Sequence, residues 1–91
     1  MVTLNLLNIF QLKVKKNSLE YEGKNVGEII TQFVSEYKDK LDNNLLDKRK
    51  KKLNDQIVIL LNGRNVMRFK KYKTKLNEGD ILYISIPITG G

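Results

Sequence analysis

Gly90 and Gly91, the last two residues of the sequence, are the positions best suited to take part in chemistry, and they follow Pro87, Ile88 and Thr89. Because glycine has no Cβ, two glycines in a row make a thin thread. Such a thread can enter the narrow active site of another protein, carboxylate first. The competing interpretation is a frayed end without a role.

The residue types that the sequence lacks restrict its own chemistry. It contains no histidine for proton transfer near neutral pH and no cysteine for a thiolate or an ordinary zinc site. The 10 acidic residues are scattered, with no pair spaced for acid–base catalysis or for magnesium. We therefore expect that the chain is not an enzyme and binds no metal or cofactor of its own. A partner would perform any chemistry at the tail.

The length of 91 residues indicates one domain with a single core. We expect that domain to span residues 1–88 and a flexible tail to span residues 89–91. The longest apolar run, Ile57–Leu61, is far too short to cross a membrane. No signal peptide is expected, because an alternating pattern starts directly after Met1. The lack of cysteine excludes disulfides, and we expect a cytoplasmic protein.

The formal net charge of +7 is concentrated in one run. That run supplies 5 of the charges and leaves +2 for the remaining chain, and it consists of Lys48, Arg49, Lys50, Lys51 and Lys52. Runs of this kind are more often solvated loop or helix than nucleic-acid sites. We expect this basic patch to speed association with an acidic partner through a field that salt screens.

The N-terminal half predicts a β-hairpin followed by one helix. Apolar residues alternate with polar ones over Val2–Leu6, and the pattern resumes weakly over Ser18–Glu22 after the polar loop Lys13–Asn17. Asn25 is a good N-cap, and Glu28 three residues later predicts a capping box. The apolar residues that follow form one stripe on a helix that runs to about residue 40, and we expect them in the core: Val26, Ile29, Ile30, Phe33, Val34 and Tyr37.

The C-terminal half predicts strands. The β-prone run Ile57–Leu61 stops at Asn62-Gly63, a turn pair. The last strand is expected over Ile81–Ile88. It should direct Leu82, Ile84, Ile86 and Ile88 to the core and send Ile81, Tyr83 and Ser85 outward. The element order ββαβ(β)β predicts an α+β domain in which one mixed sheet wraps around the helix and the terminal strands pair in the middle.

Three motifs in the C-terminal part resemble the ubiquitin-like β-grasp sulfur carriers and modifiers. They are Leu61–Gly63, Leu76–Ile81 and Pro87–Gly91. This family includes the small subunit of molybdopterin synthase, the thiamine sulfur carrier, the ubiquitin-related modifier and the small archaeal modifier proteins. The resemblance implies the β-grasp fold and a carrier whose chemistry belongs to an activating enzyme, which fits the lack of cysteine and histidine.

The resemblance also implies a mechanism for the tail. An E1-like enzyme, which supplies ATP and magnesium, would adenylate the Gly91 carboxylate, and the product would become a thiocarboxylate or an isopeptide. Gly90 adds reach, Thr89 and Ile88 hold the tail extended, and Pro87 directs the chain off the sheet edge. The partners so implied are this enzyme, the large subunit of molybdopterin synthase or a tRNA thiolation enzyme, and lysines of target proteins. A fixed role as small subunit of molybdopterin synthase is an alternative.

An outward apolar patch is expected to seat the activating enzyme. Ile81 and Tyr83 should share it with Val58 and Leu60, or with the alternate residues of the same run, because one face of that run must stay exposed. The competing interpretation is that segment 41–55 folds over this patch. The residues expected to dock the partner are therefore Val58, Leu60, Ile81 and Tyr83.

A small basic RNA-binding module is the alternative from another class. In addition to the basic patch, segment Arg68–Lys73 interleaves Phe69 and Tyr72 with basic residues, so that the rings could stack on bases. We favour the interpretation that one of the two rings lies in the core and the other half-buried on an edge strand, which gives no direct nucleic-acid binding.

Overall fold

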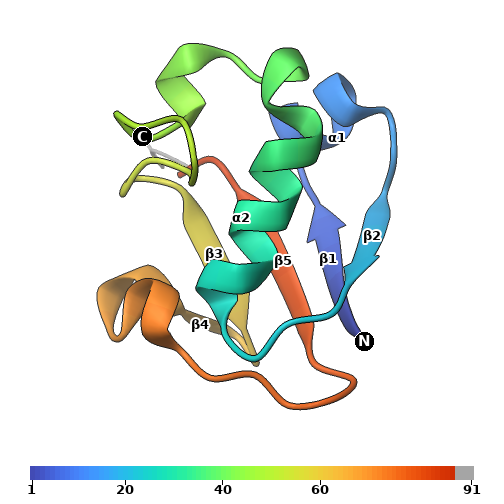
Figure 1. Cartoon of the computed structure of the whole chain (residues 1–91), viewed down its shortest axis with the longest axis vertical. Helices are drawn as coiled ribbons and strands as arrows, with labels where there is room; N and C mark the ends of the chain where they lie inside the picture. The colour runs from blue at the N-terminus through green and yellow to red at the C-terminus, as the bar shows by residue number, and fades with distance from the viewer. Residues whose placement is uncertain (88–91) are drawn as a thin grey trace.

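The computed structural model describes residues 1–87. Five strands form one mixed sheet in the order β2-β1-β5-β3-β4, and helix α2 crosses one face of it (Figure 1). The elements are β1 (Val2–Leu6), α1 (Ile9–Val14), β2 (Ser18–Tyr21), α2 (Val26–Tyr37), β3 (Val58–Leu61), β4 (Arg64–Asn65) and β5 (Ile81–Ser85). Four 3-10 turns join them: η1 (Lys38–Lys40), η2 (Asn43–Leu45), η3 (Val66–Arg68) and η4 (Lys71–Lys73).

The first and last strands pair in parallel at the centre of the sheet, as the sequence predicted. Their register runs from Thr3 beside Ile81 to Leu6 beside Ile84. The other pairs, β1 with β2, β3 with β5 and β3 with β4, are antiparallel. Every second residue of β1 is buried against α2. The expected α+β fold with a mixed sheet around one main helix is therefore confirmed.

Helix α2 begins where its cap predicts. The Asn25 side chain accepts a hydrogen bond from the Glu28 backbone N–H at 2.9 Å, which satisfies one free donor of the first turn. The Glu28 carboxylate accepts from the backbone N–H of Lys24 at 2.8 Å, one residue before the position of a standard capping box. The predicted core stripe is buried, apart from Tyr37, which is half-buried and packs on Phe33.

The connection between β1 and β2 is a short helix, where the sequence suggested only a loop. Helix α1 buries Phe10 and Val14, which lie four residues apart on one face. The Phe10 ring meets the edge of the Phe33 ring with 6.3 Å between centroids. Six residues are too few to display a helical period beside a polar stretch. The sequence pattern over this segment therefore predicted a hairpin loop.

Segment 41–55 packs into the core and does not cover the outer face of the sheet. Its buried residues join the side of the core that α2 closes, and they are Leu41, Leu45, Leu46 and Leu53. Backbone pairing between Leu46 and Leu53 closes the basic loop. The interpretation that this segment folds over Ile81 and Tyr83 is wrong, since these side chains remain 45% and 39% exposed.

Segment 66–73 forms two 3-10 turns and is not an edge strand. The expectation for its two rings was wrong in this respect. Phe69 lies at the end of η3 and is 68% exposed, so it is not in the core. Tyr72 is half-buried and donates its hydroxyl to the Leu53 carbonyl at 2.7 Å. Within residues 1–87, no helix combines the length and apolar character that crossing a membrane requires.

If α1 is part of the core, Phe10→Ala should lower the free energy of unfolding by about 3–5 kcal/mol, because it deletes a fully buried ring. Leu12→Ala on the same helix is the matched control. Its side chain is 71% exposed, so the change should be within about 0.5 kcal/mol. Urea denaturation measures both, and equal small losses would show that α1 is dispensable for the core.

Candidate functional site

The chain leaves the sheet beside the turn that follows β1. β5 ends at Ser85, short of the predicted end at Ile88, and Ile86 packs half-buried against the core. The backbone N–H of Leu7 donates to the Ile84 carbonyl at 3.1 Å, so the central pair of strands stays joined up to this point. Pro87 is exposed and is the last residue that the structure describes.

Asn8 anchors the end of β5. Its side-chain oxygen accepts hydrogen bonds from the Ser85 hydroxyl and, at 3.2 Å, from the backbone N–H of Ile86. The Asn8 backbone has φ 54° and ψ −129°, a conformation that residues other than glycine rarely adopt. In this conformation the Asn8 amide lies against the end of β5, and its two hydrogen bonds hold the chain just before Pro87.

This contact corrects one sequence expectation. Ser85 has the outward position of its strand, yet it is only 8% exposed, because the Asn8 side chain lies against its hydroxyl. Asn8 was missed because its partners lie 77 and 78 residues away in the sequence. No local pattern could have indicated this contact.

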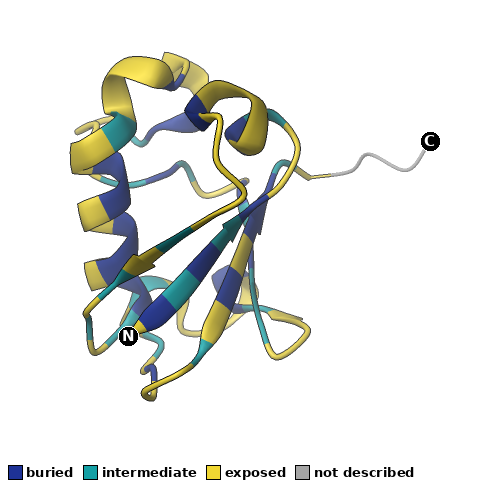
Figure 2. Cartoon of the chain, turned by 90° about the vertical axis from the view of Figure 1, so that its right-hand side faces the viewer, coloured by how far each residue is buried: buried dark blue, intermediate teal, exposed yellow. Residues whose placement is uncertain are grey.

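The outer face of β5 and β3 carries an apolar groove on the side of the sheet away from α2. Tyr83 of β5 lies opposite Leu60 of β3, and Ile81 lies one position away on the same face. With Leu7, these side chains line a groove of about 420 Å³. Burial alternates along β1 and along β5 as far as Ile84 (Figure 2). An exposed groove of this kind is typical of a surface that a partner covers.

The turn between β3 and β4 closes one end of the groove. Asn62 has φ 54° and Gly63 has φ 81°, the pair of positive values that a two-residue type I′ hairpin requires. Leu61 and Arg64 pair across it, so the turn predicted from Asn62-Gly63 is present. Both turn residues line the groove.

The structure brings together most of the residues predicted to dock a partner. Leu60, Ile81 and Tyr83 line the groove, while Val58 is half-buried and pairs with Ser85 further along the strands. The predicted tail residues beyond Pro87 lie outside the described residues, and they are Ile88, Thr89, Gly90 and Gly91. The predicted tail boundary therefore also lies outside what the structure describes.

The basic patch forms an exposed turn away from this groove. Lys48 to Lys51 are exposed, and Lys52 is half-buried. The Asp47 carboxylate faces the backbone of this turn, where it accepts from the N–H groups of Lys51 and Lys52 at 3.1 and 3.3 Å. The backbone N–H of Asp47 also donates a hydrogen bond to the Lys52 carbonyl. Asp47, which directly precedes the basic run, thus shapes the loop.

Two tyrosines have perturbed titration. Burial, followed by a 2.6 Å hydrogen bond to Glu36, raises the pKa of Tyr21. Burial, followed by the charges of Asp55 and Asp47, raises the pKa of Tyr72. Both hydroxyls act as hydrogen-bond donors, Tyr21 to Glu36 and Tyr72 to the Leu53 carbonyl. Among residues 1–87, no three side chains of the usual ligand types gather as a metal site would require.

The fold and the exit of the chain beside an apolar sheet face define a ubiquitin-like β-grasp protein. The sequence model of the ThiS family matches residues 7–91, and the chain belongs to the ThiS family. The ubiquitin-like sulfur carriers and modifiers suggested by the sequence motifs are thus confirmed as its relatives. A comparison with curated protein sequences gave no match.

Solved structures of small carriers and modifiers share the fold. Small archaeal modifier protein 1 from Methanosarcina acetivorans superposes with a TM-score of 0.81 at 23% identity, over 99% of this chain and 95% of its own. Urm1 from Trypanosoma brucei gives 0.75 at 21% identity, over 99% and 94%. The BexX/CysO complex from Amycolatopsis orientalis gives 0.72 at 25% identity, over all of both chains.

If Asn8 holds the end of β5, Asn8→Ala should lower the free energy of unfolding by about 1–3 kcal/mol, because two hydrogen bonds lose their acceptor. The amide of Ile86 should exchange with solvent faster than in the unsubstituted protein. Asn8→Asp, which keeps an acceptor oxygen, is the control and should retain most of the protection. Hydrogen exchange followed by NMR would contradict the assignment if Ile86 were equally protected in all three proteins.

Proposed function

We propose that this protein is a carrier whose Gly91 carboxylate is activated by a separate ATP-dependent, E1-like enzyme. Membership of the ThiS family supports the carrier role, and the absence of histidine and cysteine from the sequence supports the dependence on a partner. The observation that carries the proposal is the apolar groove around Tyr83, on the strand that leads directly to the C-terminal residues.

Activation makes a poor electrophile reactive. An oxygen of the Gly91 carboxylate attacks the α-phosphorus of ATP and displaces pyrophosphate, which leaves an acyl-adenylate. A hydrosulfide-equivalent nucleophile then attacks the carbonyl carbon and expels AMP, and a thiocarboxylate results. If a lysine amine attacks instead, AMP and a proton leave and an isopeptide forms. Magnesium and ATP are bound by the activating enzyme in both routes.

The groove provides the binding energy that the tail cannot provide alone. Tyr83, Ile81 and Leu60 offer a half-exposed aromatic and two aliphatic side chains, the composition typical of the centre of an interface. Val58 extends this surface along β3. A partner seated there would meet the chain at Pro87 in a direction that Asn8 fixes.

Deleting Gly91, or adding one residue after it, should abolish activation, because the reacting carboxylate is lost or displaced. The fold should remain unchanged, because the hydrophobic core is formed by residues between Val2 and Ile86. Exchange of labelled pyrophosphate into ATP, catalysed by the activating enzyme of the host, measures the first step. Circular dichroism provides the control for folding. An extended protein that is activated without trimming would disprove the role of the Gly91 carboxylate.

Tyr83→Asp should weaken the complex with the activating enzyme by about 2–4 kcal/mol, because a charge replaces an aromatic anchor in an apolar groove. Since Tyr83 is 39% exposed, the domain should remain folded. Tyr83→Phe keeps the ring and serves as the matched control, with little change expected. Isothermal calorimetry measures the affinities, and an unchanged value for Tyr83→Asp in a folded protein would assign the groove to another partner.

A further inference from the structure

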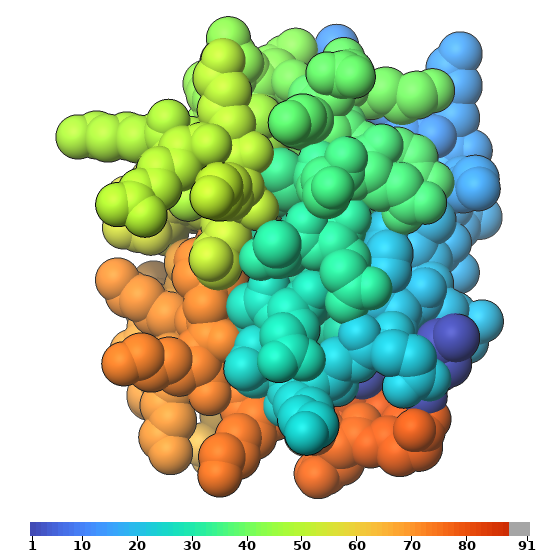
Figure 3. Space-filling model, in the orientation of Figure 1, coloured from blue at the N-terminus to red at the C-terminus, as the bar shows by residue number. Residues whose placement is uncertain are grey.

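The folded chain separates its charges far more strongly than the basic patch alone suggests. Segments 48–52 and 64–75 contain 11 of the 17 basic residues and no acidic residue. The other 6 basic residues are outnumbered by 10 acidic ones, so the remainder of the chain carries −4. These two segments, named here the basic edge, lie one above the other on the left of the molecule (Figure 3).

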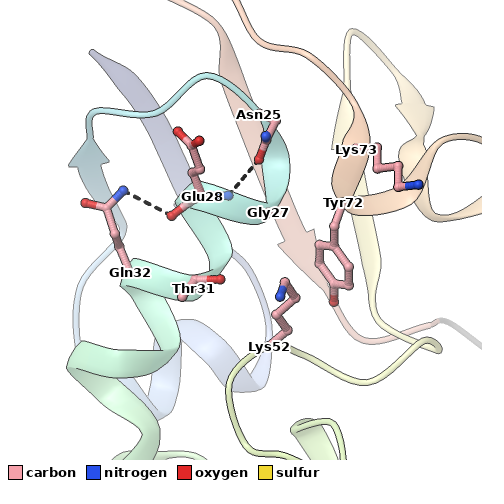
Figure 4. A pocket seen from close by; sticks show the side chains of 8 residues that line it. All are labelled: Asn25, Gly27, Glu28, Thr31, Gln32, Lys52, Tyr72 and Lys73. Atoms are coloured by element: carbon pink, nitrogen blue, oxygen red, sulfur yellow. Dashed lines mark hydrogen bonds between the residues drawn. The ribbon is translucent and has the colours of Figure 1, made fainter.

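Specific contacts hold the two segments together. The Lys52 ammonium lies over the Tyr72 ring, 5.7 Å from its centroid, and the Tyr72 hydroxyl donates to the Leu53 carbonyl. Figure 4 shows Tyr72 and Lys52 side by side next to the first turns of α2. Gly27 lets Tyr72 pack close to α2, because a Cβ at this position would lie 3.1 Å from the Tyr72 carbonyl oxygen. The Val26 N–H also donates to the Thr74 carbonyl at 2.9 Å.

The fold balances the charges of the basic edge only in part, through Asp47 and Asp55, which line one hollow together with Lys48 and Arg49. Ten of its 11 basic side chains are exposed, the exception being Lys52. The ion pairs found within residues 1–87 involve Met1 and Lys13, both outside it. Bringing 11 like charges to one edge opposes folding through their mutual repulsion. An anionic partner of high charge density removes that repulsion when it binds.

Phe69 indicates which anionic partner fits. Its ring is 68% exposed between two cationic residues, Arg68 and Lys70. It borders a groove of about 620 Å³ whose walls also include Arg64, Lys70 and Leu61. A ring for stacking between cations for phosphate contacts is typical of proteins that bind single-stranded nucleic acid. Aromatic rings also anchor protein partners, but the regular spacing of phosphates matches the Lys and Arg side chains on both sides of this ring.

We propose that the basic edge binds single-stranded RNA, with phosphates along the Lys and Arg side chains and a base stacked on Phe69 in the adjoining groove. This revises the expectation from sequence, which placed Phe69 or Tyr72 in the core and gave no nucleic-acid contact. The tail takes no part, and the RNA groove meets the groove around Tyr83 at Asn62, which lines both. The proposal therefore does not depend on activation of Gly91, and the protein could be tethered to an RNA through one surface and activated through another.

Fluorescence anisotropy with a labelled oligouridine RNA and the full chain tests this proposal. The affinity should fall steeply with salt, with a slope of roughly −0.7 per contacted phosphate. Combined Arg68→Gln, Lys70→Gln and Lys73→Gln should weaken binding about ten- to a hundredfold and flatten the slope. The combined control Lys13→Gln, Lys15→Gln and Lys16→Gln removes the same charge elsewhere and should weaken it less than threefold.

Phe69→Ala distinguishes stacking from charge. It should weaken RNA binding about tenfold without changing the salt slope, and Phe69→Tyr should restore binding. A labelled polyglutamate of matched charge should bind more weakly than RNA and be insensitive to Phe69→Ala. The proposal is overturned if RNA does not bind, if the control triple variant loses as much as the test variant, or if polyglutamate binds as well as RNA. No activating enzyme is present, so these outcomes are separate from those for Gly91.

Discussion

β1 and β5 pair in parallel at the centre of the sheet, and most other features of the molecule depend on this pairing. Because the first and last strands lie side by side, neither can be lost without dividing the sheet. Their inward residues form the floor on which α2 packs, including Leu4, Leu6, Leu82 and Ile84, all of them buried. The pairing also places the turn after β1 beside the end of β5, where the chain continues to its C-terminus.

That arrangement supports the proposed role as a specific substrate for a protein that contains no histidine or cysteine. The sheet leaves Tyr83 and Ile81 exposed in one groove. Asn8, at the start of the turn after β1, holds Ser85 and Ile86 in a defined position. Under the proposed function, the domain therefore sets both the recognition surface and the position of Pro87, and the residues that follow enter the active site of the partner. The groove of the basic edge meets the Tyr83 groove at the turn between β3 and β4, where Asn62 lines both.

Features encoded by neighbouring residues could be predicted from the sequence. The Asn25 cap, the buried stripe of α2 and the Asn62-Gly63 turn each depend on contacts within a few positions, and all three are present. The outward placement of Ile81 and Tyr83 followed from the two-residue period of a strand. The C-terminal motifs identified the family.

Features created by distant contacts could not be predicted. Helix α1 is six residues long, and it is stabilised by Phe10 packing on Phe33 more than by its own pattern. The Asn8–Ser85 contact joins residues 77 positions apart. Likewise, the two basic segments read as separate runs until the packing of Tyr72 against Lys52 joins them. In each case, tertiary packing determines the outcome and local sequence does not.

The central claim is that the Gly91 carboxylate of this protein becomes covalently activated in its host. Intact mass spectrometry of the protein isolated from that host under non-reducing, alkylating conditions tests it most directly, with fragmentation to locate any change. The account predicts a population in which sulfur replaces one oxygen at Gly91, or in which Gly91 is joined to a lysine of another protein. A protein that carries only an unmodified carboxylate at Gly91 under all growth conditions, or a modification confined to other residues, would contradict it.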